Sequence, residues 1–229
     1  MHHSGTSLDF SFGYSYSKSL DQSSSLSEAV NPVSPRLSKG LSAFDMRHNL
    51  VASYDWKLPF ATLLHRRNSW IDGWSLSGIA RFSTGLPVTL YNNNDTSLLG
   101  TIPNGINNNG VDTPNYVPGA LNLNTNPRNG KPEFNTALFS PPEFGQIGTA
   151  ARRFFAGPGM ANIDAALHKM VRLSESRSLE LRLEAFNVLN HAQFFGAASV
   201  NGNISTAGFG QITSAAAPRL IQIAARFRF

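Results

Sequence analysis

Hydrophobic and polar residues alternate with a period of two along several stretches of the chain. In residues 8–17 the even positions are apolar or aromatic: Leu8, Phe10, Phe12, Tyr14 and Tyr16. The odd positions of the same stretch are Asp, Ser or Gly. Because successive side chains of a β-strand point to opposite faces, this pattern predicts strands with one apolar and one polar face.

The same alternation predicts strands near residues 6–18, 46–58, 73–84, 161–173, 177–186 and 219–229. They are longer than the five or six residues usual in soluble sheets, and they match the roughly 9–11 residues that a tilted strand needs to cross a bilayer. Lys169 interrupts the apolar face of the fourth strand. Aromatic residues stand near the strand ends, as in the aromatic girdles of outer-membrane proteins: Tyr14, Tyr16, Trp56, Trp74, Phe227 and Phe229.

Charged residues recur on the polar faces of these strands. In residues 178–185, Glu180, Arg182 and Glu184 alternate with leucine and alanine. Charges at such positions suit a water-filled lumen, with the opposite face in lipid. The candidates for lumen-facing residues are Arg81, Asp164, Arg172, Glu180, Arg182, Glu184 and Arg226. We therefore expect an all-β fold, an antiparallel transmembrane β-barrel segment with long extracellular loops.

The connections between the predicted strands alternate in length. Residues 18–46, 84–161 and 186–220 form long connections, whereas 59–72 and 174–177 are shorter. Outer-membrane barrels alternate long extracellular loops with short periplasmic turns, so this order predicts a periplasmic C-terminus. The Asn- and Gly-rich residues 90–160 are expected to form a solvated surface loop.

A soluble antiparallel sandwich is the alternative, because it also alternates apolar and polar positions. It would make the chain a soluble or surface-attached adhesin or carbohydrate-binding protein. Strand length, aromatic residues at strand ends and charged polar faces favour the barrel.

Composition changes this interpretation little. The net charge is +5, but the only adjacent basic pairs are Arg66-Arg67 and Arg152-Arg153, so no basic stripe indicates a nucleic-acid partner. The absence of cysteine excludes disulfides and thiol chemistry. Charged residues make up 14% of the chain. This value is explained as an average over lipid-facing positions, a sparsely charged lumen face and polar loops. No apolar run is long enough for a transmembrane helix.

The sequence offers no catalytic or metal-binding constellation. Ser75 lacks the G-x-S-x-G spacing of a nucleophile elbow, and His2-His3 is the only histidine pair at short spacing. Glu180 and Glu184 would lie about 13 Å apart on a strand, too far for a pair of glycosidase carboxylates. Asp95 and Asp112 lack the ligand pattern of a calcium loop. We expect no enzyme activity, metal or cofactor.

Arg152 and Arg153 stand just before the fourth predicted strand. Two interpretations remain open for this pair. The arginines anchor a loop through hydrogen bonds, which is favoured, or they contact an anionic ligand or a plug domain.

Five segments, residues 44–60, 73–89, 152–173, 179–194 and 218–229, resemble the C-terminal part of TonB-dependent outer-membrane receptors of the Oar-like branch, whose members carry a carboxypeptidase-regulatory-like domain. The ordered D-x-R-H…L-P-F and F-N-x-x-N stretches carry the resemblance. It implies a barrel of about 22 strands with an N-terminal plug. It also implies active uptake of a large or scarce ligand, such as a siderophore, cobalamin, a glycan or a peptide.

The resemblance also implies partners: outer-membrane lipid, the periplasmic TonB energy-coupling protein, acting through the plug, and the barrel-insertion machinery. The assembly signal read by that machinery would comprise Ile221, Ile223, Phe227 and Phe229. The sequence departs from the family in lacking a signal peptide, a plug and a TonB box. Since about eight strands are the minimum for a barrel, we expect residues 1–229 to be the C-terminal part of one barrel domain, not transport-competent alone.

Overall fold

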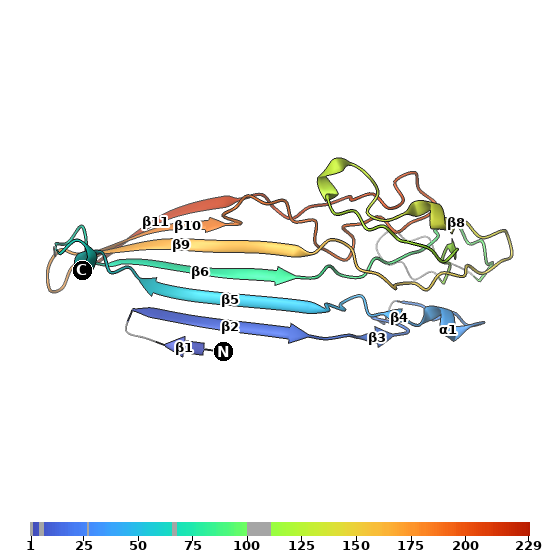
Figure 1. Cartoon of the computed structure of the whole chain (residues 1–229), viewed down its shortest axis with the longest axis horizontal. Helices are drawn as coiled ribbons and strands as arrows, with labels where there is room; N and C mark the ends of the chain where they lie inside the picture. The colour runs from blue at the N-terminus through green and yellow to red at the C-terminus, as the bar shows by residue number, and fades with distance from the viewer. Residues whose placement is uncertain (1, 5–6, 27, 66–67, 100–110) are drawn as a thin grey trace.

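The computed structural model describes residues 2–4, 7–26, 28–65, 68–99 and 111–229. Its main element is a 7-stranded antiparallel sheet in the order β1-β2-β5-β6-β9-β10-β11, seen in Figure 1 as a single layer of long strands. The strands are β1 (His2–Ser4), β2 (Leu8–Tyr16), β5 (His48–Lys57), β6 (Trp74–Ser83), β9 (Met160–Arg172), β10 (Ser178–Phe186) and β11 (Leu220–Arg228).

The six long strands lie at the ranges that the alternation predicts, with ends shifted by one or two residues. The sequence analysis missed β1, which pairs with β2 through His2↔Ser11 and Ser4↔Asp9. It is too short for a period-two pattern to be recognised. The all-β, antiparallel fold class is confirmed.

The strand register gives the sheet two chemically different faces. Residues paired across antiparallel strands point to the same face. One row across the sheet is apolar: Leu8, Trp56, Leu76, Leu167, Leu183 and Ile223. The next row, on the opposite face, is mostly polar: Asp9, Asp55, Ser77, Ala166, Glu184 and Gln222. We call these the apolar face and the polar face.

No second layer covers the apolar face within the described ranges. The other two sheets have two strands each, β3 (Leu20–Asp21) with β4 (Gly40–Leu41), and β7 (Asn115–Tyr116) with β8 (Phe139–Ser140). Both lie in the loops beyond the long strands (Figure 1). Ile223 is 80% exposed and Tyr16 64%. A sandwich requires a second sheet against this face, so the fold gives no support to that alternative.

All long connections lie at one end of the sheet, which we call the loop end. The connections after β2, β6 and β10 lie there, whereas the C-terminus and the connections after β5 and β9 lie at the other end (Figure 1). The helices are short: α1 (Pro35–Ser38), α2 (Phe60–Leu63), η1 (Pro127–Asn129) and η2 (Thr136–Leu138). Among the described residues no helix is long and apolar enough to cross a membrane.

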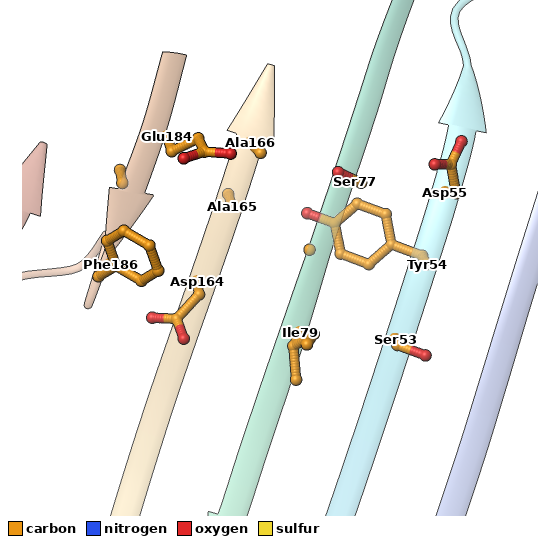
Figure 2. A pocket seen from close by; sticks show the side chains of 12 residues that line it. Ser53, Tyr54, Asp55, Ser77, Ile79, Asp164, Ala165, Ala166, Glu184 and Phe186 are labelled. Carbon is orange, nitrogen blue, oxygen red and sulfur yellow. The ribbon is translucent and has the colours of Figure 1, made fainter. Parts of the chain in front are cut away.

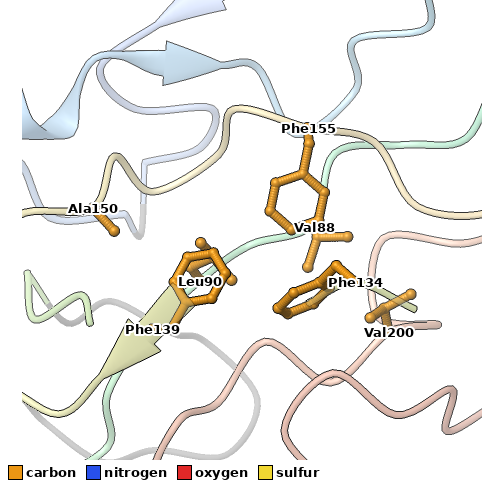
Figure 3. Close-up of a cluster of buried hydrophobic side chains, with 7 residues drawn as sticks. All are labelled: Val88, Leu90, Phe134, Phe139, Ala150, Phe155 and Val200. Carbon is orange, nitrogen blue, oxygen red and sulfur yellow. The ribbon is translucent and has the colours of Figure 1, made fainter. Parts of the chain in front are cut away.

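The hydrophobic core lies among the loops, not against the sheet. It consists of Val88, Leu90, Phe134, Phe139, Ala150, Phe155 and Val200 (Figure 3). The predicted loop of residues 90–160 is therefore partly packed where the structure describes it, and its residues 100–110 lie outside the described residues. Asn92 is 2% and Asp112 0% exposed, because the segment packs against the connection after β10 around these apolar side chains.

The abundant asparagines of the loop end hold the turns of this packed region. Many accept a hydrogen bond from the backbone N–H two residues later, which satisfies donors that no regular element pairs. The loop-end asparagines that do so are Asn31, Asn92, Asn124, Asn126, Asn129, Asn135, Asn201 and Asn203. An asparagine-rich composition thus builds ordered loops here.

Candidate functional site: the two faces of the sheet and its loop end

A row of charged and polar side chains lies on the polar face over strands β9, β10 and β11. Arg182 Nε donates to His168 Nδ1 at 3.1 Å and lies 3.4 Å from Glu180 Oε1. Arg182 Nη1 is 3.8 Å from Glu184 Oε1, and Arg228 Nη2 is 3.8 Å from Glu180 Oε2. The side chains of Arg182 and Arg228 are half exposed, so these pairs add little stability and mainly make the face polar.

The register places every candidate for a lumen-facing residue on this polar face. Glu180 pairs with Arg226, Ser178 with Arg172, and Arg81 with Asn162. Asp164 pairs with Ile79, an apolar residue on the same face. His168 was not among the candidates, although the alternation puts it on the polar face; it contacts Arg182 and lies 3.3 Å from Ser77 Oγ through Nε2. Its position in the alternation was available as a signal.

A shallow hollow of about 310 Å³ lies against β5, β6, β9 and β10 (Figure 2). Its lining includes Asp55, Asp164 and Glu184, which belong to the polar face. Gly78 also lines the hollow and pairs with Tyr54 of β5, and a Cβ at Gly78 would lie 2.7 Å from the Tyr54 hydroxyl. The Tyr54 ring covers the glycine of the neighbouring strand, a recurrent way of stabilising glycine in sheets.

Aromatic side chains mark both ends of the apolar face. At the loop end, Tyr14 Oη lies 2.8 Å from His48 Nδ1, and the Tyr16 ring centroid is 5.2 Å from that of His48. Trp56 and Trp74 lie toward the opposite end. His48 and Trp56 are separated along β5 by about 27 Å at ~3.4 Å per residue, which at a tilt of about 35–45° spans roughly 19–22 Å, most of an apolar band about 25 Å tall.

Lys169 is a charged residue on the apolar face, yet it is only 4% exposed. Its Nζ donates to the carbonyl of Trp70 at 2.9 Å and to the carbonyl of Asp72, both in the connection after β5. Nζ also lies 5.1 Å from the centre of the Trp74 ring. The interruption seen in the sequence is therefore an anchor for this connection, with its charge against backbone oxygens and an aromatic face.

The predicted assembly signal lies at the C-terminal edge of the sheet. Ile221, Ile223 and Phe227 pair with Ala185, Leu183 and Leu179, which places them on the apolar face. Phe229 follows β11 and is 93% exposed, with its ring centroid 6.1 Å from that of Phe227. Whether these residues act as a signal stays a prediction.

At the loop end, Arg152 and Arg153 form a buried cluster with Glu28, which we call the arginine clasp. Arg153 Nη1 donates to Glu28 Oε1 at 2.6 Å, and Arg152 Nη1 to Glu28 Oε2 at 2.9 Å. Arg153 Nε also donates to the Leu41 carbonyl at 2.8 Å. Of the two interpretations of this pair, the structure supports loop anchoring, because the clasp joins the connection after β2 to the one after β6.

The clasp fixes the ionisation of Glu28. Burial alone would raise the pKa of this carboxyl. Hydrogen bonds from Arg153 and the Ser24 N–H, together with the charges of Arg153 and Arg152, outweigh burial and lower the pKa to about 2. Sequence reasoning missed Glu28, since 125 positions separate it from Arg153 and no local pattern links them.

The F-N-x-x-N stretch ends β10 and ties three strands together. Asn187 and Asn190 adopt positive φ angles of 51°, which asparagine tolerates better than most residues. Asn187 N–H donates to Asp164 Oδ1 of β9 at 2.8 Å. Asn190 Oδ1 accepts from the Arg219 N–H, just before β11, at 3.2 Å. This motif has a structural role at the rim of the sheet.

The other candidates for chemistry remain apart. Ser75 lies within β6, and Asp95 and Asp112 belong to the packed loops. Among the residues that the structure describes, no three His, Asp or Glu side chains gather in a way that could hold a metal ion.

A single-layer antiparallel sheet with one exposed apolar face, one polar face and aromatic residues at both ends defines the class of membrane-spanning β-sheets. In agreement, the family model for an outer membrane beta barrel domain matches residues 1–222. The chain belongs to this family, and the membership indicates an outer-membrane location. Neither the curated proteins nor the solved structures contain a match to the chain.

Proposed function

We propose that the sheet is a sector of a closed transmembrane β-barrel, with its apolar face in lipid and its polar face toward a water-filled lumen. The main support is the register, which separates apolar and polar residues across all the long strands. Strands β1 and β11 stand at the ends of the sheet. Lipid cannot satisfy the backbone groups of open edges, so further strands would close the barrel, and about 22 is the number implied by the resemblance.

The proposed orientation puts the loop end outside the cell and the C-terminus in the periplasm. Its support is the segregation of long and short connections at opposite ends of the sheet (Figure 1). The packed core of the loop end is consistent with an ordered structure over the barrel mouth.

The barrel would serve active uptake of a large or scarce ligand in a TonB-dependent receptor, with the plug and the TonB contact contributed outside residues 1–229. The resemblance of five segments to that family supports this role, as does the membership in the outer-membrane barrel family. The ligand class would be a siderophore, cobalamin, a glycan or a peptide. Catalysis has no part in this proposal.

Single cysteines test the orientation, because the chain has none of its own. Phe144→Cys places a thiol at an exposed loop-end position, and Glu175→Cys places one in the short connection after β9. A membrane-impermeant maleimide should label the first in intact cells and the second only after the outer membrane is permeabilised. The reverse pattern would refute the orientation.

Transport is tested in the bacterium that carries the protein. Uptake of a ferric siderophore, cobalamin, an oligosaccharide and a peptide is compared in three strains: the parent, a strain lacking this gene and a strain lacking TonB. For one of these ligands, loss of the gene and loss of TonB should reduce uptake to the same extent. If none of the four responds to loss of the gene, the transport role is wrong.

A further inference from the structure

The loop end contains a second hollow of about 350 Å³, which we call the loop hollow. Residues 124–128 and 133 of the connection after β6 form one side, and Pro158 and Gly159 border it. The other side consists of His191, Ala192 and Phe194 of the connection after β10. Small-ligand sites begin at about 300 Å³, so one sugar-sized unit fits.

Glu133 is a buried lining residue with an unsatisfied oxygen. It is 3% exposed, and its Oε2 is buried without a hydrogen-bond partner. The backbone is fixed on both sides, since its N–H donates to the Gly210 carbonyl at 2.8 Å and its carbonyl accepts from Asn124 N–H at 2.7 Å. Burial raises the pKa of this carboxyl to about 7. Buried polar groups are nearly always paired, so an orphan carboxyl oxygen at a hollow points to a missing partner.

The other side of the hollow offers the ring of His191. Gln193 Oε1 accepts from Ala161 N–H at 2.9 Å, which identifies Nε2 as the donor end of this amide. Gln193 Nε2 donates to the carbonyls of Ala161 and His191 and also lies 3.2 Å from His191 Nδ1. The two N–H groups of this amide suffice for the two carbonyls, so either tautomer of the His191 ring fits, and its Nε2 can donate to a ligand or accept from one.

Two further polar groups and an aromatic ring complete the lining. Asn126 Oδ1 accepts from Arg128 N–H at 3.3 Å, which leaves the amide NH₂ of Asn126 available. The Arg128 side chain is exposed at the same hollow, and Phe194 adds an apolar surface.

We propose that the loop hollow binds a neutral, hydroxyl-rich ligand, namely one unit of a saccharide. Hydroxyl groups both donate and accept, so they satisfy Glu133 and the His191 ring in either tautomer, together with the donors of Asn126 and Arg128. A simple amine would face the Arg128 guanidinium, and a simple anion would face Glu133. The Phe194 ring suits the apolar C–H surface of a sugar.

This inference deepens the proposed function by choosing the glycan among its ligand classes, and it rests on that function for access to the hollow from outside the cell. Binding is measured separately from uptake. A protein that binds sugar without importing it would therefore refute the transport role and leave the site intact.

The test uses Ala192→Cys, a lining position, in the protein within intact outer membranes. Maleimide labelling is timed with and without glucose, galactose, mannose or N-acetylglucosamine. At a sugar concentration about ten times Kd, labelling should slow about tenfold, because only the free fraction reacts. Ala197→Cys, an exposed position in the same connection, is the control and should keep its rate.

Glu133→Gln in the Ala192→Cys background should weaken protection at least tenfold, whereas Glu143→Gln, at an exposed carboxylate outside the hollow, should not. The labelling rate of Ala192→Cys without sugar shows whether the loop stays folded in the Glu133→Gln variant. If the loop is not folded in that variant, protection is measured in the His191→Ala variant instead. The proposal would be overturned if none of the sugars protects the cysteine, or if the free zwitterionic amino acid alanine protects it and the sugars do not. Equal protection in the Glu133→Gln and Glu143→Gln variants would also overturn it.

Discussion

Arg153 donates a hydrogen bond to Glu28 over 2.6 Å, although the two residues are 125 positions apart in the chain. Arg153 is 2% exposed and the Glu28 side chain 15%. The contact therefore lies inside the loop end, where Arg152, Ser24 and the Leu41 carbonyl share its hydrogen bonds. It fixes the connection after β2 against the connection after β6, and with it the shape of the region above the sheet.

Breaking the clasp on one side should destabilise the loop end strongly. Arg153→Met leaves Glu28 buried with fewer partners, and loss of one member of a buried pair costs about 3–5 kcal/mol. Limited proteolysis of the protein in outer membranes should show faster cleavage in the loops. Arg36→Met, at an exposed arginine of the connection after β2 that also contains Glu28, is the control. Equal cleavage of the Arg153→Met and Arg36→Met variants would show that the clasp does not hold the loops.

The clasp also predicts acid sensitivity. The pKa of Glu28 is about 2 in the folded chain and 4.5 in the reference state, so the folded chain favours the ionised form. Its stabilising effect is complete above pH 4.5 and disappears as the pH falls toward 2. At about 1.4 kcal/mol per pKa unit, the loss reaches roughly 3 kcal/mol.

This loss is measured by urea unfolding of the loop end at pH values between 6 and 3, with unfolding monitored by the rate of proteolytic cleavage. The expected size of the loss is ~1.4 kcal/mol for each unit by which the pKa of Glu28 is lowered. The Glu28→Gln variant lacks the titrating group, so its stability should depend less on pH over the acid range. An equally steep dependence in the variant would assign the acid sensitivity to other carboxyls.

The strands were predictable from the sequence because each long strand contacts two different surroundings, which imposes a period of two on residues such as Leu179 to Glu184. The loop core was not. Phe134, Phe155 and Val200 come from distant segments without periodicity, and only the folded chain brings them together. The asparagines indicated a solvated loop, since their bonds to backbone N–H groups cannot be distinguished in sequence from ordinary turn composition.

The candidate site divides in the same way. Glu180, Arg182 and Glu184 could be placed on one face from their spacing alone, and the register agrees. Glu28 and Glu133 could not be found, because their importance depends on burial and on partners far along the chain. Arg152 and Arg153 were noticed as a pair, but their partner was not.

Replacing Lys169 by methionine should loosen the connection after β5. The variant keeps a long apolar side chain but leaves the carbonyls of Trp70 and Asp72 without the ammonium donor. Such unpaired groups cost about 1–3 kcal/mol. Lys57→Met, at an exposed lysine of β5, is the matched control. A lower unfolding midpoint in detergent for Lys169→Met alone would agree, and a higher one would show that the charge on the apolar face is a net cost.

Two substitutions at Asn187 separate backbone conformation from side-chain bonding. Asn187→Gly keeps the positive φ accessible but loses the side-chain bonds to the His191 N–H and carbonyl. Asn187→Ala loses the same bonds and adds strain of about 1 kcal/mol at this φ. Chemical unfolding in detergent should therefore rank wild type above Asn187→Gly and Asn187→Gly above Asn187→Ala. If the glycine variant matches wild type, the side chain contributes nothing at this rim.

The exposure of Phe229 makes its proposed signalling role separable from any role in stability. Phe229 is 93% exposed, so Phe229→Ser removes little packing. If the barrel-insertion machinery reads this ring, the variant should reach the outer membrane in severalfold lower amount, whereas the protein that does assemble should unfold at the wild-type temperature. Arg228→Ser, at the preceding exposed position, controls for an altered terminus. Equal amounts of the Phe229→Ser and Arg228→Ser proteins would remove Phe229 from the signal, and a lowered unfolding temperature would indicate a structural contact instead.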